Sequence, residues 1–430
     1  MVQKIVLIGA GSAMFTQGLV ADLILSGQPW QLGLVDIDLE ALEVATGLSQ
    51  RMIQYKDAPI VLQSSLERRD VLPGADVVVT TIGVGGRKAW LADVQIPRRY
   101  NVYQPVGDTI MAGGISRAMR MIPALVEIAR DIKRLCPQAL FVNYANPMST
   151  NCWAIRQATG VPVVGLCIGV YDVQLELSRL IGAPEDEVTA RALGINHFTW
   201  IYDLRWRGKD AWPLVRQAVA EKPPKENRFS WSLFETYGAY PAVNDRHVTE
   251  FFPERFPNGD YYGKTLGIGA YSIEQTIEHG QRIYESMRAQ ARGELPISDH
   301  VFERSQGEHG QLIEILQAMA QDKRSYYTAN LPNNDLVPAF PREAILELTA
   351  AASARGLQAL QVPDLPPALL PPLMRKIAVQ SLTVQAALTG DRKLFVETLL
   401  LDGCVAHQDT ARRLVDDLIL EHKVYLPQFA

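Results

Sequence analysis

The sequence predicts an α/β protein, with a doubly wound parallel sheet in its N-terminal half and a mixed, largely helical α+β domain in its C-terminal half. Short runs rich in valine and isoleucine alternate with helical patterns over residues 1–195. Strands that are apolar throughout are typical of parallel sheets buried on both faces. Residues 196–430 are mostly helical in pattern, with proline-rich breaks, which predicts a second domain that closes a crevice over the sheet.

The strands expected in the first domain are residues 4–11, 31–38, 75–83, 139–146 and 161–167, and helices are expected over residues 13–27 and 116–135. Several of these strands end in glycine, aspartate, asparagine or cysteine. In doubly wound sheets, ligands bind at the carboxyl ends of the strands. We therefore expect Asn146 and Cys167 to lie at the same edge of the sheet as Gly9 and Gly11.

The composition excludes several classes of protein. The 430 residues are 47% hydrophobic and 21% charged, with a formal net charge of −5, which is ordinary for a soluble globular protein. There is no basic patch and no apolar run long enough to span a membrane, so neither nucleic acid nor a membrane is an expected partner. The four cysteines lack zinc-finger or redox-pair spacing, which favours a reducing cytoplasm.

The turn after the first strand reads GAGSAM and indicates dinucleotide binding in a Rossmann-like domain. Its candidate contacts are Gly9, Gly11, Ser12 and Met14, together with Asp36 and Gly83 at the ends of later strands. Two glycines allow a tight turn and a close approach to a pyrophosphate at a helix N-terminus. A carboxylate at Asp36 favours NAD over NADP, because it would repel a 2′-phosphate. The alternative is a glycine turn in another α/β fold.

Two further residues suggest a metal site. Cys167 ends the apolar run VPVVGLC, and His197 lies in GINHFTW, where a new strand begins. Thiolate and imidazole together suit a borderline divalent metal. From residue spacing alone, a buried thiol and a structural histidine remain the more favoured interpretation.

A resemblance to a known family changes that balance. The chain resembles glycoside hydrolase family 4 over essentially its whole length, and most closely its α-galactosidase and α-galacturonidase subgroup. The matching segments are GAGS, VDID, QPVGDTIMAGGISRAMRMIP, VNYANPMST, VGLC, GINH, PAVNDRHVTEFFP, ANLPNNDLVPAFPREAILEL and LPPLMRKIAVQSLTVQAALTGDRKLFVETLLLD.

The resemblance implies an unusual hydrolysis of α-glycosides (galactosides, glucosides or uronides). Bound NAD takes hydride from C3 of the sugar, and the resulting ketone acidifies the C2 proton. A base removes that proton, the glycosidic bond leaves by elimination, water adds, and the hydride returns. This family is an exception to the usual pair of carboxylates. A polarised ketone stabilises the enediolate, which explains a requirement for Mn²⁺ or a similar ion.

The resemblance also implies roles for individual residues. Cys167 and His197 match the family's metal ligands, and Asn146 matches an asparagine that contacts the sugar. Other expected contacts are the substrate residues Arg117 and Arg246, the base candidates Asp245 and then Tyr240, and the loop residues Asp108 and His247. For a uronate, Arg246 and Arg87 are the candidate cations. The family further implies a fold like that of lactate and malate dehydrogenases, and a homodimer or homotetramer.

One position departs from the family pattern. Many members have a histidine or aspartate after the cysteine, as the acid for the leaving group, whereas this chain has Ile168. Either Asp108, His247 or Asp172 supplies the proton, or the leaving group is activated, or the reaction differs. Two other functions stay open at this stage: an NAD-dependent dehydrogenase of hydroxy acids or sugars, and a non-catalytic NAD-binding sensor.

Overall fold

The fold is seen in a computed structural model, which describes residues 2–303, 310–362 and 365–429. Its main sheet contains β1 (Gln3–Ile8), β2 (Trp30–Val35), β3 (Ile60–Ser65), β4 (Val77–Thr80), β5 (Leu140–Asn143), β6 (Val164–Gly165), β7 (Val188–Ile195), β8 (Phe198–Trp206), β9 (Lys209–Asp210), β10 (Tyr240–Pro241), β13 (Ser325–Pro332), β14 (Ile345–Ser353) and β15 (Gly356–Ala359). A separate hairpin pairs β11 (Asp260–Tyr261) with β12 (Lys264–Thr265).

The first six strands form the predicted parallel sheet. Their spatial order is β3-β2-β1-β4-β5-β6, and each neighbouring pair is parallel. This is the strand order of dinucleotide-binding domains, with the crevice between β1 and β4 at the point where the order reverses. All four residues of β4 are buried although alternate side chains point to opposite faces, so both faces are covered.

The sheet then continues without a break into strands from the C-terminal half. β13 pairs antiparallel with β6, and β14, β7, β8 and β10 follow in that order. The main-sheet strands β3, β7, β9, β10, β13, β14 and β15 were not predicted from the sequence. A buried run such as residues 345–353 does not separate strand from helix by periodicity, and β3 has a single buried residue, Ile60. The strand expected at 161–167 is only Val164–Gly165, since Pro162 has no N–H to donate.

The helices are α1 (Thr16–Leu25), α2 (Leu39–Lys56), α3 (Arg68–Val71), α4 (Gly86–Arg98), α5 (Met111–Leu135), α6 (Met148–Thr159), α7 (Gly169–Leu180), α8 (Trp212–Glu221), α9 (Arg228–Tyr237), α10 (Asp245–Val248), α11 (Ile273–Arg292), α12 (Gly310–Ala320), α13 (Leu370–Thr389), α14 (Arg392–Asp402) and α15 (Gln408–His422). Within the residues described, no helix combines the length and the apolar character that crossing a membrane requires.

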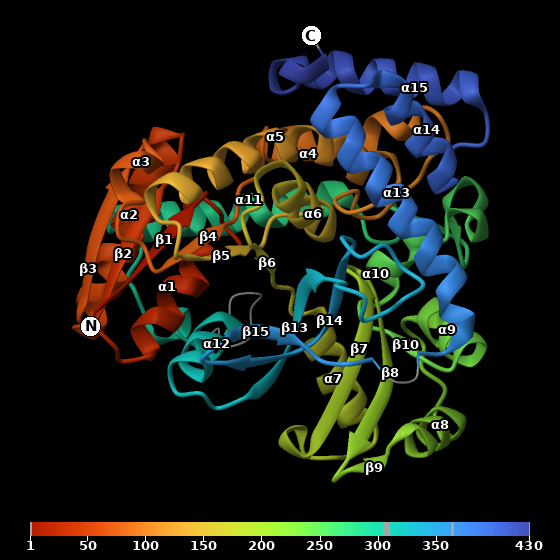
Figure 1. The fold of residues 1–430 in the computed structure, drawn as a ribbon, viewed down its shortest axis with the longest axis horizontal. Helices are drawn as coiled ribbons and strands as arrows, with labels where there is room; N and C mark the ends of the chain where they lie inside the picture. Colours follow the sequence, from red (N-terminus) through yellow and green to blue (C-terminus); the bar gives the residue numbers. More distant parts are fainter. Residues whose placement is uncertain (1, 304–309, 363–364, 430) are drawn as a thin grey trace.

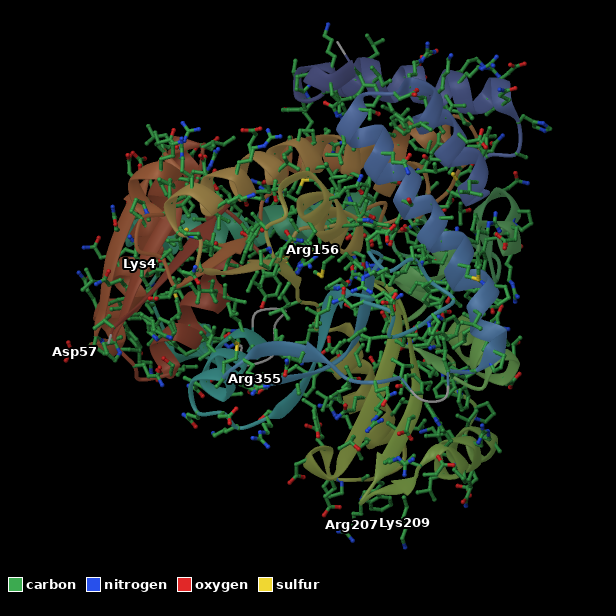
Figure 2. All side chains as sticks on the ribbon, viewed as in Figure 1. Lys4, Asp57, Arg156, Arg207, Lys209 and Arg355 are labelled. Carbon is green, nitrogen blue, oxygen red and sulfur yellow. The ribbon has the colours of Figure 1, made fainter. Side chains whose placement is uncertain are left out.

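The last three helices return to the first half of the chain. α13 and α14 pack on α5, and α15 packs on α4, at the end of the molecule opposite β3 (Figure 1). At the turn between β8 and β9, by contrast, Arg207 and Lys209 point away from the body of the molecule (Figure 2). The chain therefore folds back so that its C-terminus supports helices that border the parallel sheet.

A buried ion cluster fixes this return. Arg120 of α5 donates two hydrogen bonds to Asp93 of α4, at 2.8 and 2.7 Å. His422 at the end of α15 lies 2.9 Å from the same carboxylate. Arg120 also donates to the carbonyl of Val84, at 3.3 Å, in the turn after β4. Burial opposes ionisation of Asp93, but its cationic partners lower its pKa overall.

Removal of this carboxylate should destabilise the fold strongly. We expect Asp93→Ala to lower the free energy of unfolding by about 3–5 kcal/mol, because it leaves the Arg120 guanidinium buried without its partner. The matched control is Arg130→Ala, which breaks an exposed pair with Glu127 and should cost at most about 1 kcal/mol. Urea unfolding followed by circular dichroism measures both. Equal losses in the two variants would contradict the role of the cluster.

Candidate functional site

The glycine turn after β1 has the geometry that a dinucleotide requires. Gly9 has a φ of +94°, and a Cβ there would lie 2.9 Å from the backbone N of Ile82. The N–H of Gly11 donates to the carboxylate of Asp36 at 2.7 Å, so the turn and the end of β2 are joined. The helix α1 begins at Thr16, directly after the turn. The backbone here is therefore open to a phosphate at a helix N-terminus.

Apolar side chains flank this turn and suit an adenosine. Ile37, which follows Asp36, is 91% exposed, and Met14 is 59% exposed. Isolated apolar residues on a surface are common, but these two lie at the edge where a nucleotide base would lie.

Gly83, at the end of β4, lies next to Arg117: a Cβ on this glycine would be 3.7 Å from Nη2 of the arginine. The residues present thus fit NAD.

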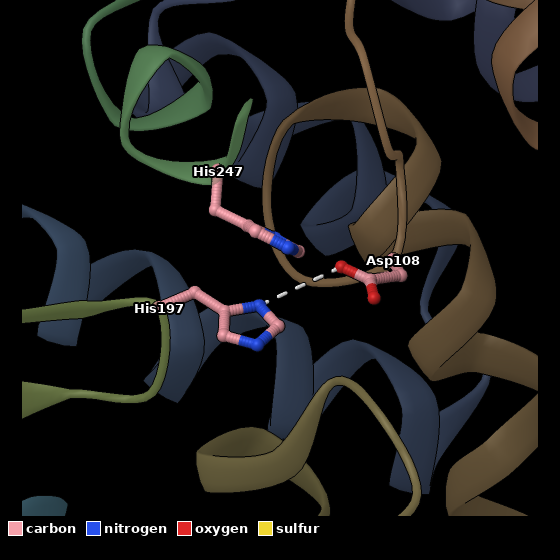
Figure 3. Close-up of side chains that lie close together, drawn as sticks. All are labelled: Asp108, His197 and His247. Atoms are coloured by element: carbon pink, nitrogen blue, oxygen red, sulfur yellow. Dashed lines mark ion pairs between the residues drawn. The ribbon is translucent and has the colours of Figure 1, made fainter. Parts of the chain in front are cut away.

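Three other predicted residues form a compact cluster. The possible ligand atoms of Asp108, His197 and His247 all lie within 4.8 Å of one another. The rings of His197 and His247 have centroids 4.1 Å apart, and Asp108 Oδ1 lies 3.8 Å from His197 Nδ1 (Figure 3). Three different segments supply these side chains: the loop before α5, the turn between β7 and β8, and α10.

The protonation states of this cluster suit a divalent cation. Burial alone would raise the pKa of Asp108, but His197, His247, Thr109 and Arg117 together lower it to about 2. Burial and the neighbouring His197 lower the pKa of His247 well below 6.5. A carboxylate and a neutral imidazole are the forms that bind metals. His247 Nδ1 is also buried without a hydrogen-bond partner, so the cluster fits a metal ion.

Asn146 and Arg117 connect this cluster to the edge of the sheet that carries the glycine turn and Gly83. Asn146 Nδ2 donates to Asp108 Oδ2 at 2.9 Å, and Arg117 Nε donates to the carbonyl of Asn146 at 3.0 Å. Asn146 Oδ1 is buried and has no partner, so it is free to accept a hydrogen bond from a ligand. Arg117 also lies next to Gly83. One chain of contacts therefore leads from Gly83, after β4, to the cluster of Asp108, His197 and His247.

Cys167, predicted as the second metal ligand, is not one of these three residues. It is buried at the end of β6, and its Sγ lies 3.5 Å from the N–H of Gly169, at the start of α7. Ile168 is buried too and occupies the N-cap of α7. Whether Cys167 contributes a ligand stays a prediction.

The two base candidates lie in crowded surroundings. Asp245 is fully buried, and its carboxylate accepts hydrogen bonds from Ser230 Oγ, from Tyr261 OH and from the N–H groups that begin α9. Tyr240 is 2% exposed and lies in a second apolar cluster, with its hydroxyl 3.3 Å from Asn244 Oδ1. Burial and the negative charges of Glu176 and Asp245 raise the pKa of Tyr240. Their catalytic roles stay predictions.

The remaining predicted residues, Arg246, Arg87 and Asp172, differ in how far their side chains are already engaged by other parts of the protein. Arg246 Nη2 donates to Thr276 Oγ1 at 3.2 Å, while its Nε is buried without a partner. Arg87 is committed to α11, where it donates to Gln281 and lies over the ring of Tyr284. Asp172, in the first turn of α7, has an exposed side chain, and partial burial together with Glu176 raises its pKa.

The sequence analysis missed the carboxylate that supports His197. Glu347 of β14 is 2% exposed and accepts hydrogen bonds from Asn196 Nδ2 at 3.0 Å, Thr199 Oγ1 at 2.6 Å and Asn330 Nδ2 at 2.8 Å. It thereby holds both sides of His197, which has a φ of +64°. A lone glutamate within the apolar run AILEL was the available signal, because a buried acid needs partners.

A second unpredicted glutamate lies behind Asp108. Glu250, in the 3₁₀ turn Thr249–Phe251 that continues α10, is 1% exposed. Its Oε1 accepts hydrogen bonds from the backbone N–H groups of Val106 and Gly107. Burial, followed by the charge of Asp108, raises the pKa of Glu250 to about 8. At neutral pH this side chain is therefore mostly protonated.

Comparison with known proteins identifies related chains over almost the full length. Residues 4–183 match the family 4 glycosyl hydrolase model, and residues 192–405 match the model of the C-terminal domain of family 4 glycosyl hydrolases. An α-galactosidase of Rhizobium meliloti (strain 1021) is 29% identical over 99% of this chain and 90% of its own. An α-galacturonidase of Bacillus subtilis (strain 168) is 29% identical over 97% of this chain and 96% of its own.

Solved structures confirm the fold class. A 6-phospho-α-glucosidase from gut microorganisms, in complex with NAD and Mn²⁺, superposes with a TM-score of 0.87 at 19% identity, covering 100% of both chains. Malate dehydrogenase of Cryptosporidium parvum superposes with a TM-score of 0.54 at 14% identity, covering 90% of this chain and 99% of its own. The predicted likeness to the malate dehydrogenase fold is therefore confirmed.

The raised pKa of Glu250 predicts a pH-dependent stability. The folded chain holds a proton on Glu250 up to about pH 8, whereas the unfolded chain releases it near the ordinary glutamate pKa of 4.5. The stability that this proton contributes is complete below about pH 4.5 and is lost as the pH rises to about 8. Glu250→Gln does not titrate, so its melting temperature relative to the parent chain should increase between pH 5 and pH 8 and then level off. Melting curves with EDTA present test this; a constant difference would contradict it.

Proposed function

Because the chain belongs to family 4 of the glycosyl hydrolases, we propose that the cluster of Asp108, His197 and His247 beside the glycine edge is the site at which it cleaves α-glycosides. The predicted enzyme class, a glycosidase that requires NAD and a divalent metal, is confirmed by this membership. The observation that carries the assignment is the chain of contacts from Gly83 through Arg117 and Asn146 to Asp108. A hydroxy-acid dehydrogenase or an NAD sensor would leave this cluster without a role.

The residues divide the work by their chemistry. When bound, NAD would supply reversible removal of hydride from C3 of the sugar, and the divalent ion would polarise the resulting ketone, which acidifies the C2 proton. We assign the NAD contacts to the turn at Gly9–Gly11 and to Asp36, and the divalent ion, Mn²⁺ first, to the three-residue cluster with Cys167 as a further ligand. Asn146 Oδ1, which lacks a partner, is placed to accept a hydrogen bond from a sugar hydroxyl.

The base candidates act in different ways in this proposal. Proton removal needs an acceptor lone pair within reach of the substrate. Both oxygens of Asp245 already accept hydrogen bonds from the protein, so we assign Asp245 to holding Tyr261 and the start of α9 in position. Tyr240, with its raised pKa, keeps its proton at neutral pH and serves as base only if a neighbouring group relieves it of that proton.

The leaving group receives little help from this site. Ile168 has no proton to donate, Asp108 is ionised, and His247 is neutral at neutral pH. Of the three candidate acids for the leaving group, Asp108, His247 and Asp172, only Asp172 has a raised pKa, but its side chain is exposed on α7. We infer that the chain favours glycosides whose leaving group departs without protonation, such as aryl glycosides.

Two substrate classes are proposed, in order. α-Galactosides come first, since α-galactosidases are among the relatives of highest coverage. α-Galacturonides come second, favoured by Arg246: this cation has a buried Nε without a partner and directly precedes His247. An unpaired buried donor of this kind suits a carboxylate.

We also propose that the enzyme works in the cytoplasm as a homodimer or homotetramer. None of the four cysteines (Cys136, Cys152, Cys167 and Cys404) forms a disulfide bond, and three of them are buried, which suits a reducing compartment. The proposed oligomeric state, a homodimer or homotetramer, rests on the family resemblance. Analytical ultracentrifugation of the purified chain would measure that oligomeric state directly.

The metal assignment predicts which variants lose the ion. We expect His197→Ala and His247→Ala to weaken Mn²⁺ binding by at least about tenfold, since each removes one donor from a small set. Cys167→Ser should weaken it as well if the thiolate is a further ligand. The control is His279→Ala, an exposed histidine on α11. Titration followed by electron paramagnetic resonance measures free Mn²⁺. Unchanged binding in His247→Ala would contradict the three-residue cluster.

The proposed reaction predicts product labelling. With NAD, Mn²⁺ and a reductant present, aryl α-galactosides should release the phenol, whereas β-anomers should not. In D₂O the released sugar should carry deuterium at C2, because that proton is removed during elimination. The rate should also rise steeply as the pKa of the phenol falls. Turnover that is unaffected by EDTA, or a product without C2 label, would contradict the mechanism.

The same assay separates the two substrate classes. Arg246→Gln should raise KM for an aryl α-galacturonide by about tenfold or more, and should leave KM for the galactoside unchanged, because only the uronide carries a carboxylate for this cation. Arg282→Gln, an exposed arginine on α11, is the control.

A further inference from the structure

Glu250 lies at a junction between two parts of the site. It follows His247 by three residues in one continuous segment, α10 and the 3₁₀ turn Thr249–Phe251. On its other side, it accepts hydrogen bonds from Val106 N at 2.7 Å and from Gly107 N at 2.8 Å. Asp108 is the next residue along that loop. One carboxyl group therefore connects the segments that carry two of the three clustered side chains.

The loop that carries Asp108 is held by side chains rather than by a helix or strand of its own: besides Glu250, Trp90 Nε1 donates to the carbonyl of Val106, and Gln104 Oε1 accepts from the N–H of Gly113. Residues 99–110 connect α4 and α5 without a helix or strand. Gly107 has a φ of +64°, and a Cβ there would lie 2.5 Å from Val94 Cγ2. Successive N–H groups in such a left-handed turn point together and form a small concavity that binds an anion or a carboxyl oxygen. Glu250 Oε1 fills this concavity.

The position of the loop is transmitted directly to the cluster. Thr109 Oγ1 donates to Asp108 Oδ1 at 2.7 Å and lies 2.8 Å from His197 Nδ1. The third side chain, His247, is on the same segment as Glu250 itself. If the two N–H groups lost their acceptor, Asn146 and Thr109 would still contact Asp108, but the hydrogen bonds that join its loop directly to the segment of His247 would be lost.

We propose that Glu250 is a positioning residue that sets the separation of Asp108 and His247 and thereby the affinity of the site for its divalent ion. The proposal rests on the assignment of Asp108, His197 and His247 to the metal. Glu250 itself is not a ligand in this scheme, because it lies outside the cluster of possible ligand atoms, and its Oε1 accepts hydrogen bonds from two backbone donors. Supporting groups of this kind change metal affinity by about 10- to 100-fold.

The test compares two substitutions of Glu250 with a control at another helix. Glu250→Ala removes the acceptor, whereas Glu250→Gln keeps an oxygen in its place. Asp391→Ala is the control, because Asp391 also accepts hydrogen bonds from two successive N–H groups, of Lys393 and Leu394, at the start of α14. The probes are Mn²⁺ affinity, by electron paramagnetic resonance titration, and NAD affinity, by fluorescence, both with substrate absent. Melting temperature shows whether each variant is folded.

We expect Glu250→Ala to weaken Mn²⁺ binding by about tenfold or more, with NAD binding unchanged, and Glu250→Gln to bind Mn²⁺ like the parent chain. Asp391→Ala should lower the melting temperature without changing Mn²⁺ affinity. Parent-like Mn²⁺ binding in folded Glu250→Ala would overturn the proposal, as would equal losses in Glu250→Ala and Glu250→Gln. If the parent chain binds no Mn²⁺, the metal assignment of the proposed function fails first, and this proposal fails with it.

Discussion

One row of paired residues across the sheet connects the two halves of this protein. At one level of the sheet, the neighbours are Val35, Ile8, Thr80, Asn143, Gly165, Asn330, Glu347, Gly194 and Thr199, one from each successive strand. The row begins beside the glycine turn and ends two residues after His197. Glu347 and its three donors occupy the point where parallel pairing has given way to antiparallel pairing. A buried carboxylate is tolerable there because β13, β8 and the turn after β7 each supply it with a hydrogen bond.

This continuity explains why the site is assembled from distant segments without a flexible interface. The cluster combines a loop of the first half with a hairpin turn and a short helix of the second half. The C-terminal helices add a second support, since the Asp93 ion pair joins α15 to the helices bordering the parallel sheet, and Arg120 also holds Val84 beside the nucleotide edge. Both supports are buried and polar, so they specify geometry more than they add stability.

The sequence predicted which edge of the sheet carries the site, but it did not predict all the residues from other segments that meet there. The glycine turn, Asp36 and Asn146 follow strands whose apolar runs are unmistakable, and the position of a strand end in a parallel sheet determines where its side chains meet. His247 stood out as part of a polar segment flanked by aromatic residues and proline, but only the family resemblance brought Asp108 into the site, because no local pattern relates a loop at 108 to a helix at 247. Glu250 and Glu347 were overlooked, although each is a single acid in an apolar run, which is itself a sign of a buried hydrogen-bond acceptor.

The electrostatics of the site separate its two tasks. His197, Thr109 and Arg117 help to keep the pKa of Asp108 low, and burial keeps the pKa of His247 well below its usual range, so the cluster presents a carboxylate and a neutral imidazole, the forms that bind a cation. In these protonation states neither Asp108 nor His247 is a good proton donor. At the position beside Cys167, where a proton donor is expected, this chain has Ile168. In the proposed assignment, metal binding and leaving-group protonation therefore compete for the same side chains. In this chain the charges favour the metal, so the departure of the leaving group must depend on the substrate's own chemistry.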